Sequence, residues 1–327
     1  MANLPLTLAC GPYDRMEALQ NGVVRPEGID LTYLSIQSPP EIFARMIKKH
    51  SFDLAEMSMS MYIQARQKGN FPFIALPVFP VRLFRHGYIF INKRSGITAP
   101  KDLHGKRIGV PEYRQTAAVW IRGMLQHEYG VDLDSIHWFE GGMNAAREQN
   151  SLDIRPPGPL KIDFVSETTL NQMLVDGELD ACIGARRPAA MGHHPDIAKL
   201  FPDARRVEQE YYRKTGIFPM MHTVVIREEL LAAKPWIAES MYKAFVQAKD
   251  WCLEQMRFSG TNRYMLPWLF DDLDEMDAVF GKDPWPYGVE PNRPTIEALD
   301  QYLFDQRFTS KRSNIDELFV PLILANE

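Results

Sequence analysis

The chain has 327 residues, of which 45% are hydrophobic and 24% are charged. These are ordinary values for a globular protein, so they exclude a disordered or fibrous chain, and the length favours two domains. The formal net charge of −5 argues against a nucleic acid as the partner. A mildly acidic protein can nevertheless gather its arginines in one pocket that binds a small anion.

The cysteines, Cys10, Cys182 and Cys252, lie far apart and form no CxxC motif. This spacing indicates neither a disulfide framework nor a zinc site, and it fits a reducing compartment. The first residues run directly into a predicted strand without the pattern of a signal peptide, and no apolar run is long enough to cross a membrane. We therefore expect a cytoplasmic protein with no membrane partner, unless a leader has been removed.

Short β-rich runs alternate with helical segments through most of the chain, which predicts an α/β fold. The first part is predicted as strands over residues 6–9, 29–34 and 52–55, with helices near 16–20, after Ser38, and after Ser58 or Ser60 as far as Gln67. The second part is predicted as strands over 86–92, up to Val110, and over 135–139, 181–184 and 219–227, with helices from Thr116 and over 170–174. Beyond residue 227 the chain is predicted to be helical, apart from a proline-rich turn at 283–288.

This order predicts two lobes. Residues 1–92 and 221–327, including the helical C-terminal region, form the first lobe, and residues 93–220 are inserted as the second. The strands at 86–92 and 219–227 would then be two crossings between the lobes. A cleft flanked by two crossings is a natural site for a small molecule and a natural hinge.

The arrangement resembles the type II periplasmic-binding-protein fold, and residues 52–56, 97–110 and 176–181 look like landmarks of its lobes. More specific blocks are similar to the 4,5-dihydroxyphthalate decarboxylase family: 13–15 (YDR), 79–87 (FPVRLFRHG), 110–123 (VPEYRQTAAVWIRG), 215–222 (TGIFPMMH) and 284–288 (PWPYG). This resemblance covers essentially the whole chain. It implies a carboxy-lyase that converts a small aromatic dicarboxylate, 4,5-dihydroxyphthalate, to protocatechuate and CO2.

Arginines near the predicted crossings are candidates for binding such a diacid. Guanidinium groups pair both oxygens of a carboxylate, and Arg82 and Arg85 lie directly before the strand at 86–92. Arg114 and Thr116 lie at the start of a long predicted helix, where free backbone N–H groups favour an anion. The plain alternatives are surface ion pairing for the arginines and N-capping for Thr116.

Two histidines are candidates for proton transfer. His86 and His222 begin the two predicted crossings, so both are expected to face the floor of the cleft, although an isolated histidine beside an apolar strand is commonly a core residue. His193 and His194 precede Pro195 in a predicted loop, and we expect them at the surface.

Polar residues that follow strands are also well placed, because ligands of open α/β sheets gather beyond the carboxyl ends of the strands. These residues are Tyr13, Asp14, Arg15, Glu56, Ser58 and Arg186. The alternatives for Asp14 and Ser58 are turn and cap roles.

The expected mechanism is decarboxylation without an organic cofactor. A ring hydroxyl held by Asp14 or Glu56 would push electrons toward the ring carbon that bears the carboxylate, and His86 or His222 would protonate that carbon. The same histidines with Asp14 or Glu56 could instead bind a divalent metal, which no ligand spacing demands.

Two alternatives remain at this point. A non-catalytic solute-binding protein or sensor for an aromatic acid would share the fold, the cleft and the arginines. A relative of the thiamine-pyrimidine synthases would share the lobes, but no lysine for pyridoxal phosphate stands out, and GxGxxG, GxxxxGK, HExxH and GxSxG motifs are absent from the sequence. The helical C-terminal region offers surface for a homo-oligomer.

Overall fold

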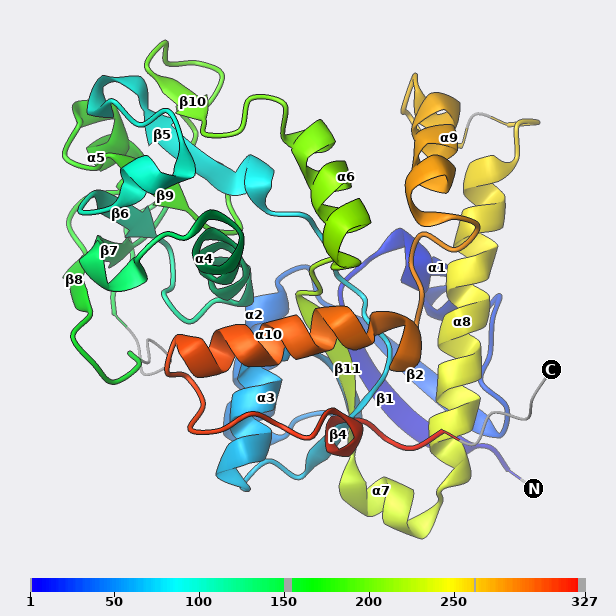
Figure 1. Cartoon of the computed structure of the whole chain (residues 1–327). Coiled ribbons are helices and arrows are strands. Elements are labelled where there is room, and N and C mark those ends of the chain that lie inside the picture. The colour runs from blue at the N-terminus through cyan, green and yellow to red at the C-terminus, as the bar shows by residue number, and fades with distance from the viewer. Residues whose placement is uncertain (1, 150–154, 262, 323–327) are drawn as a thin grey trace. The chain divides into compact units, whose positions relative to one another are not determined.

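The computed structural model describes residues 2–149, 155–261 and 263–322 (Figure 1). The described residues divide into two compact units. Unit 1 is drawn from Met1–Arg82, Met220–Arg293 and Ser313–Glu327, and unit 2 from Leu83–Pro219 and Pro294–Arg312. The sequence analysis assigned the whole of 221–327 to the first lobe, whereas Pro294–Arg312 groups with unit 2, so the chain passes between the units more often than the two expected crossings.

Unit 1 is built on a five-stranded mixed sheet with the order β2-β1-β3-β11-β4. Its strands are β1 (Leu4–Cys10), β2 (Ile29–Ser35), β3 (Leu54–Ser58), β4 (Phe73–Leu76) and β11 (His222–Arg227). Strands β1, β2 and β3 are parallel, and β11 runs antiparallel to β3 and β4. Every residue of β3 is buried, which explains why this run is apolar on both faces except at Glu56 and Ser58.

Unit 1 also contains helices from the N-terminal and the C-terminal parts of the chain (Figure 1). They are η1 (Asp14–Met16), α1 (Glu17–Gln20), α2 (Pro39–Lys49), α3 (Met59–Lys68), α7 (Glu228–Ala233), α8 (Trp236–Arg257), α9 (Leu269–Phe280), η6 (Glu290–Asn292) and η7 (Ile315–Leu318). Ser58 caps α3, since its side chain accepts a hydrogen bond from the Met61 amide at 3.4 Å. Ser38 occupies the N-cap of α2 without a capping bond from its side chain.

Unit 2 is built on a six-stranded sheet with the order β10-β5-β9-β6-β7-β8. Its strands are β5 (Ile89–Asn92), β6 (Arg107–Val110), β7 (His137–Gly141), β8 (Lys161–Val165), β9 (Ala181–Ile183) and β10 (Ile197–Lys199). Its helices are η2 (His86–Tyr88), η3 (Lys93–Ser95), η4 (Pro100–Leu103), α4 (Thr116–Tyr129), η5 (Leu133–Ser135), α5 (Leu170–Asp176), α6 (Ala204–Thr215) and α10 (Arg293–Asp305), the last of which begins in unit 1. The core packs Ile108, Ile121 and Trp138 between the sheet and α4.

The predicted strand at 86–92 is partly wrong. His86–Tyr88 form the short 3-10 helix η2, in which the Tyr88 amide donates to the Arg85 carbonyl at 3.0 Å, and the strand begins only at Ile89. The predicted strand at 219–227 likewise begins at His222, while Met220 forms only an isolated bridge with Arg82. Within the described part of the chain, every helix is too short or too polar to span a bilayer.

Candidate active site

A buried carboxylate organises the polar residues of unit 1. Glu56 lies in the middle of β3 and is 0% exposed. Its Oε2 accepts hydrogen bonds from the Gly11 amide at 3.0 Å and the Cys10 thiol at 3.6 Å, and its Oε1 accepts from the Tyr13 hydroxyl at 2.7 Å and from Nδ1 of His222. A buried charge is tolerated only with such partners, so these donors hold Glu56 in one orientation.

The surroundings of Glu56 keep it ionised. Burial alone would raise the pKa of this carboxyl, but the charge of His222 and the hydrogen bonds from His222, Tyr13 and Gly11 outweigh it, and the pKa lies below its usual value. Burial and the neighbouring Glu56 charge raise the pKa of Tyr13 far above its usual range, so Tyr13 stays a neutral donor.

His222 is the first residue of β11 and lies opposite Ser58 in the β3–β11 pair. Because an ionised carboxylate can only accept, the hydrogen between His222 and Glu56 belongs to Nδ1. Among the described residues, Nε2 has no hydrogen-bond partner, and 17% of the side chain is exposed beside the edge of Phe43, with ring centroids 4.9 Å apart. Nε2 is therefore the atom of this cluster that can exchange a proton with a ligand.

Asp14 is engaged with its neighbour rather than with Glu56. Its carboxylate accepts from the Arg15 amide at 2.7 Å and from Nη1 of Arg15 at 2.9 Å. Arg82 is buried in the same unit, where its guanidinium donates to the side chain of Asn292 and lies 5.3 Å from the Phe79 ring centroid.

In unit 2, Arg85 is a buried guanidinium. It is 5% exposed, it lies 5.0 Å from the centroid of the Tyr88 ring, and Nε and Nη1 have no hydrogen-bond partner among the described residues. Burial lowers the pKa of Arg85 to about 10, against the opposing charges of Tyr88 and Glu208.

His86 lies in an aromatic cage of unit 2. It is 1% exposed, and the rings of Tyr129, Phe201 and Tyr211 surround it at centroid distances of 6.1, 5.3 and 5.1 Å. Neither ring nitrogen has a partner among the described residues, and burial lowers the pKa of His86 to about 4. The neutral imidazole thus packs as an aromatic core residue at neutral pH.

The other predicted residues of unit 2 differ in exposure. Arg114 and Thr116 are buried at the start of α4, where Gln115 rather than Thr116 occupies the N-cap. Arg186 is exposed after β9. His193 is exposed and His194 is half-buried, in a turn that precedes β10.

One relative matches this chain over nearly its full length, and a second matches about two thirds of it. A 4,5-dihydroxyphthalate decarboxylase of Comamonas testosteroni is 35% identical over 326 residues, covering 99% of this chain and 98% of the relative. The chain belongs to the 4,5-dihydroxyphthalate decarboxylase family. A second protein of this name, from Pseudomonas putida, is 38% identical over 215 residues, covering 65% of this chain and 83% of the relative. The family resemblance read from the sequence is confirmed.

The fold of this decarboxylase family member is that of the periplasmic binding proteins, as the sequence predicted. Residues 15–151 match a family described as the phosphonate ABC transporter periplasmic substrate-binding protein. The crystal structure of the periplasmic aliphatic sulphonate binding protein of Escherichia coli superposes with a TM-score of 0.58 at 10% identity and covers 98% of both chains. The alkanesulfonate-binding protein of Xanthomonas axonopodis pv. citri, bound to MOPS, gives 0.54 at 13% identity, covering 98% of this chain and 99% of that one.

In this family member, unit 1 brings together four of the predicted residues. These are Tyr13, Glu56, Ser58 and His222. Sequence reasoning missed Cys10 and Gly11 as donors to Glu56, and it placed Arg15 beyond the end of a strand without giving it a role of its own. The rule that led to Tyr13, position beyond the carboxyl end of a strand, applies equally to Cys10 and Gly11 and could have found them.

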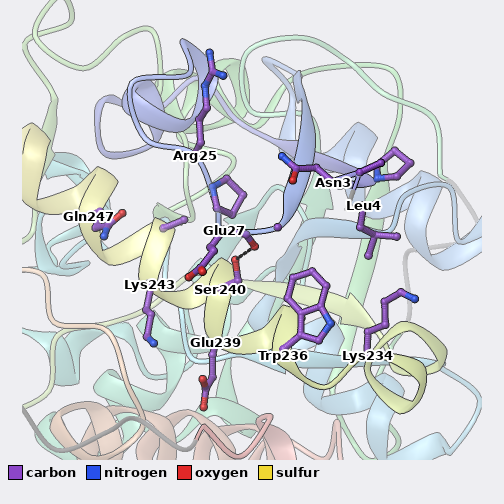
Figure 2. Close-up of a pocket in the computed structure, with 15 residues that line it drawn as sticks. Asn3, Leu4, Arg25, Glu27, Lys234, Trp236, Glu239, Ser240, Lys243 and Gln247 are labelled. Atoms are coloured by element: carbon purple, nitrogen blue, oxygen red, sulfur yellow. Dashed lines mark hydrogen bonds between the residues drawn. The ribbon is translucent and has the colours of Figure 1, made fainter.

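A surface pocket of about 880 Å³ in unit 1 is separate from this cluster. It lies where β1 begins, whereas the Glu56 cluster lies where β1 ends, and none of the predicted site residues lines it. Figure 2 shows Trp236 and Lys243 of α8 beside it, with Ser240 Oγ donating to the Glu27 carbonyl at 2.7 Å. Within the described ranges, no three or more His, Cys, Asp or Glu side chains are grouped so as to hold a metal.

Proposed function

We propose that this protein decarboxylates 4,5-dihydroxyphthalate to protocatechuate and CO2, with His222 as the proton donor. The observation that carries the proposal is the bond between Nδ1 of His222 and the buried Glu56, which leaves Nε2 without a partner among the described residues. The substrate class is supported by the names of the two relatives.

The reaction transfers one proton to the ring. Nε2 of a protonated His222 gives its proton to the ring carbon that bears the departing carboxylate, and a C–H bond forms. The hydroxyl para to that carbon supplies the electrons. The bond to the carboxylate then breaks, its electron pair restores the aromatic ring, and CO2 leaves. His222 recovers a proton from water, and loss of either carboxylate gives the same product because the substrate is symmetric.

Glu56 and Tyr13 act as positioning residues in this scheme. Glu56 is fully buried and its oxygens are occupied, so it holds the His222 ring in place rather than touching substrate. The sequence analysis had placed Glu56 or Asp14 on the ring hydroxyls. The bonds of Asp14 to Arg15 favour an orienting role for Asp14 as well.

The surroundings of the two histidines favour His222 over His86. A proton donor needs a ring nitrogen that reaches the substrate and is protonated near neutral pH. His86 is enclosed by three aromatic rings, and its low pKa of about 4 keeps it neutral. We assign it a structural role in unit 2.

The expected substrate-binding residues remain proposals. They are Ser58, Arg82, Arg85, Arg114, Thr116 and Arg186, whereas Tyr13, which was also expected to bind substrate, takes the positioning role given above. Arg85 has the strongest support, because a buried guanidinium with unsatisfied N–H groups is costly unless an anion binds it. Arg186 has the weakest support, because its side chain is exposed.

We further propose a cytoplasmic homo-oligomer that uses no organic cofactor. All three cysteines are free and buried, which suits a reducing compartment. Self-association is supported by exposed apolar side chains between α8 and α9 and in the first turn of α9: Phe258, Met265, Leu266, Trp268 and Phe270.

The test is to incubate the purified protein with 4,5-dihydroxyphthalate, with and without EDTA, and to follow protocatechuate by chromatography. We expect turnover that EDTA does not reduce. Turnover that is lost with EDTA and restored by a divalent metal would contradict the metal-free scheme. Saturable binding of phthalates without any product would favour the solute-binding alternative.

A further inference from the structure

We infer that Arg15 binds the carboxylate that the substrate retains, an inference that rests on the proposed decarboxylation. Arg15 lies two residues after Tyr13, in unit 1, within the short helix η1. The sequence placed it among the polar residues that follow strands, but none of the roles proposed above belongs to it.

The guanidinium of Arg15 is fixed in one orientation. It lies 4.4 Å from the Tyr13 ring centroid and 4.7 Å from that of Trp285. Nε donates to the Pro80 carbonyl and Nη1 donates to Asp14 at 2.9 Å. Nη2 has no partner among the described residues, and the side chain is 18% exposed, so one edge of the guanidinium is satisfied by protein and the other can take a ligand.

The residues behind Arg15 are themselves anchored. The Trp285 indole donates to the Phe79 carbonyl at 2.8 Å, and the Trp285 amide donates to Asp283 at 2.9 Å. Asp283 in turn accepts from the buried Lys249 at 2.5 Å. Because the rings and the loop are held before any ligand arrives, little ordering cost remains for binding to Arg15.

Tyr13 links this guanidinium to the proton donor. The face of the Tyr13 ring packs against the Arg15 guanidinium, and the Tyr13 hydroxyl donates to Glu56, which accepts from His222. Arg15 and His222 are thus joined through Tyr13 and Glu56. This arrangement suits an aromatic diacid, because Arg15 can bind the carboxylate at one ring position while His222 protonates the ring carbon at another.

The chemistry decides which carboxylate Arg15 binds. An ion pair stabilises a carboxylate but not the neutral CO2 that leaves, so a strong pair on the departing group would oppose the reaction. On the retained carboxylate the same pair is present in substrate, transition state and product. It therefore strengthens binding throughout without changing the chemical step.

The experiment compares Arg15→Gln and Arg15→Lys with a matched control, Arg45→Gln. Arg45 also lies over an aromatic ring, Phe52 at 4.4 Å, beside a carboxylate, Glu41 at 3.5 Å, but it is exposed on α2. Turnover of 4,5-dihydroxyphthalate gives kcat and KM, and calorimetry gives the Kd of protocatechuate, which keeps a carboxylate, and of catechol, which has none.

For Arg15→Gln we expect a KM and a protocatechuate Kd about 10- to 100-fold higher, from the loss of a charge-assisted pair, with kcat within about threefold and catechol affinity unchanged. Arg15→Lys keeps the charge but not the planar fork, so we expect a smaller loss of the same kind. If Arg15→Gln does not fold, the KM and the protocatechuate Kd of Arg15→Lys test the role of Arg15 instead. The control variant Arg45→Gln should have the same kcat, KM and Kd values as the unmodified protein.

An unchanged KM, or equal losses for protocatechuate and catechol, would overturn the role of Arg15 while decarboxylation by the unmodified protein stands. An unmodified protein that neither turns over 4,5-dihydroxyphthalate nor binds protocatechuate would overturn both proposals.

Discussion

His222 donates from Nδ1 to the carboxylate of Glu56, which lies 166 residues earlier in the chain. The two residues are diagonal neighbours on adjacent antiparallel strands, where Glu56 pairs with Val224 and Ser58 pairs with His222. A one-residue slip of β11 against β3 would turn His222 to the other face of the sheet, so the register of this strand pair fixes the contact between His222 and Glu56.

Replacing Glu56 by glutamine should lower kcat at least tenfold with little change in KM. The amide keeps the shape and an oxygen for Nδ1, but it removes the negative charge that binds the His222 N–H, so the ring is held less firmly. Steady-state kinetics check this, with Glu41→Gln on the exposed face of α2 as the control.

A purely structural role of Glu56 would instead lower the melting temperature of Glu56→Gln and leave the kcat of the folded variant as in the unmodified protein.

Tyr13→Phe and Tyr33→Phe form a matched pair. The Tyr13 hydroxyl donates to Glu56 at 2.7 Å, and the Tyr33 hydroxyl donates to the Gly11 carbonyl at the same distance. Each change should cost about 1 kcal/mol of stability in urea unfolding. Only Tyr13→Phe should also reduce kcat, about 3- to 30-fold, because it loosens the carboxylate that orients His222. Equal kcat values for the two variants would contradict the positioning role of Tyr13.

The sequence predicted the residues of the cluster better than their contacts. Tyr13, Glu56 and Ser58 could be found because each follows or ends a strand of an α/β pattern, which is a local property. That Glu56 faces His222 depends on how β11 pairs with β3 across most of the chain, and a single sequence carries no signal for such a register.

Contacts between distant segments, which a single sequence does not reveal, also explain why some elements were missed or misplaced and why His86 was expected to face the cleft. The three residues of β10 are too few for a periodic pattern, and an apolar run such as HGYIFIN cannot reveal that its first residues close a 3-10 turn. His86 and His222 precede similar runs, yet packing encloses one in three rings and leaves the other beside a carboxylate.

The cage around His86 predicts a pH-dependent stability. The folded pKa of about 4 lies below the ordinary value of 6.5, so the unfolded chain binds more protons between these values. The contribution of neutral His86 is therefore complete above about pH 6.5 and is lost as the pH falls toward 4, an effect of the order of 3 kcal/mol.

Urea unfolding of the unmodified protein and of His86→Leu at pH 7.5 and pH 5 checks this effect. The leucine variant should lose clearly less stability on acidification and should keep kcat within about threefold at pH 7.5. Identical losses in the two proteins would show that His86 does not titrate as its surroundings indicate.

Turnover of 4,5-dihydroxyphthalate by His222→Gln, measured beside the unmodified protein, tests the central claim most directly. Loss of a general acid typically costs about 10²- to 10⁴-fold in rate. We predict that the unmodified protein forms protocatechuate and that the folded variant has a kcat at least 100-fold lower with a similar KM. A folded His222→Gln variant that forms protocatechuate at the unmodified rate would contradict the assignment of His222 as the proton donor.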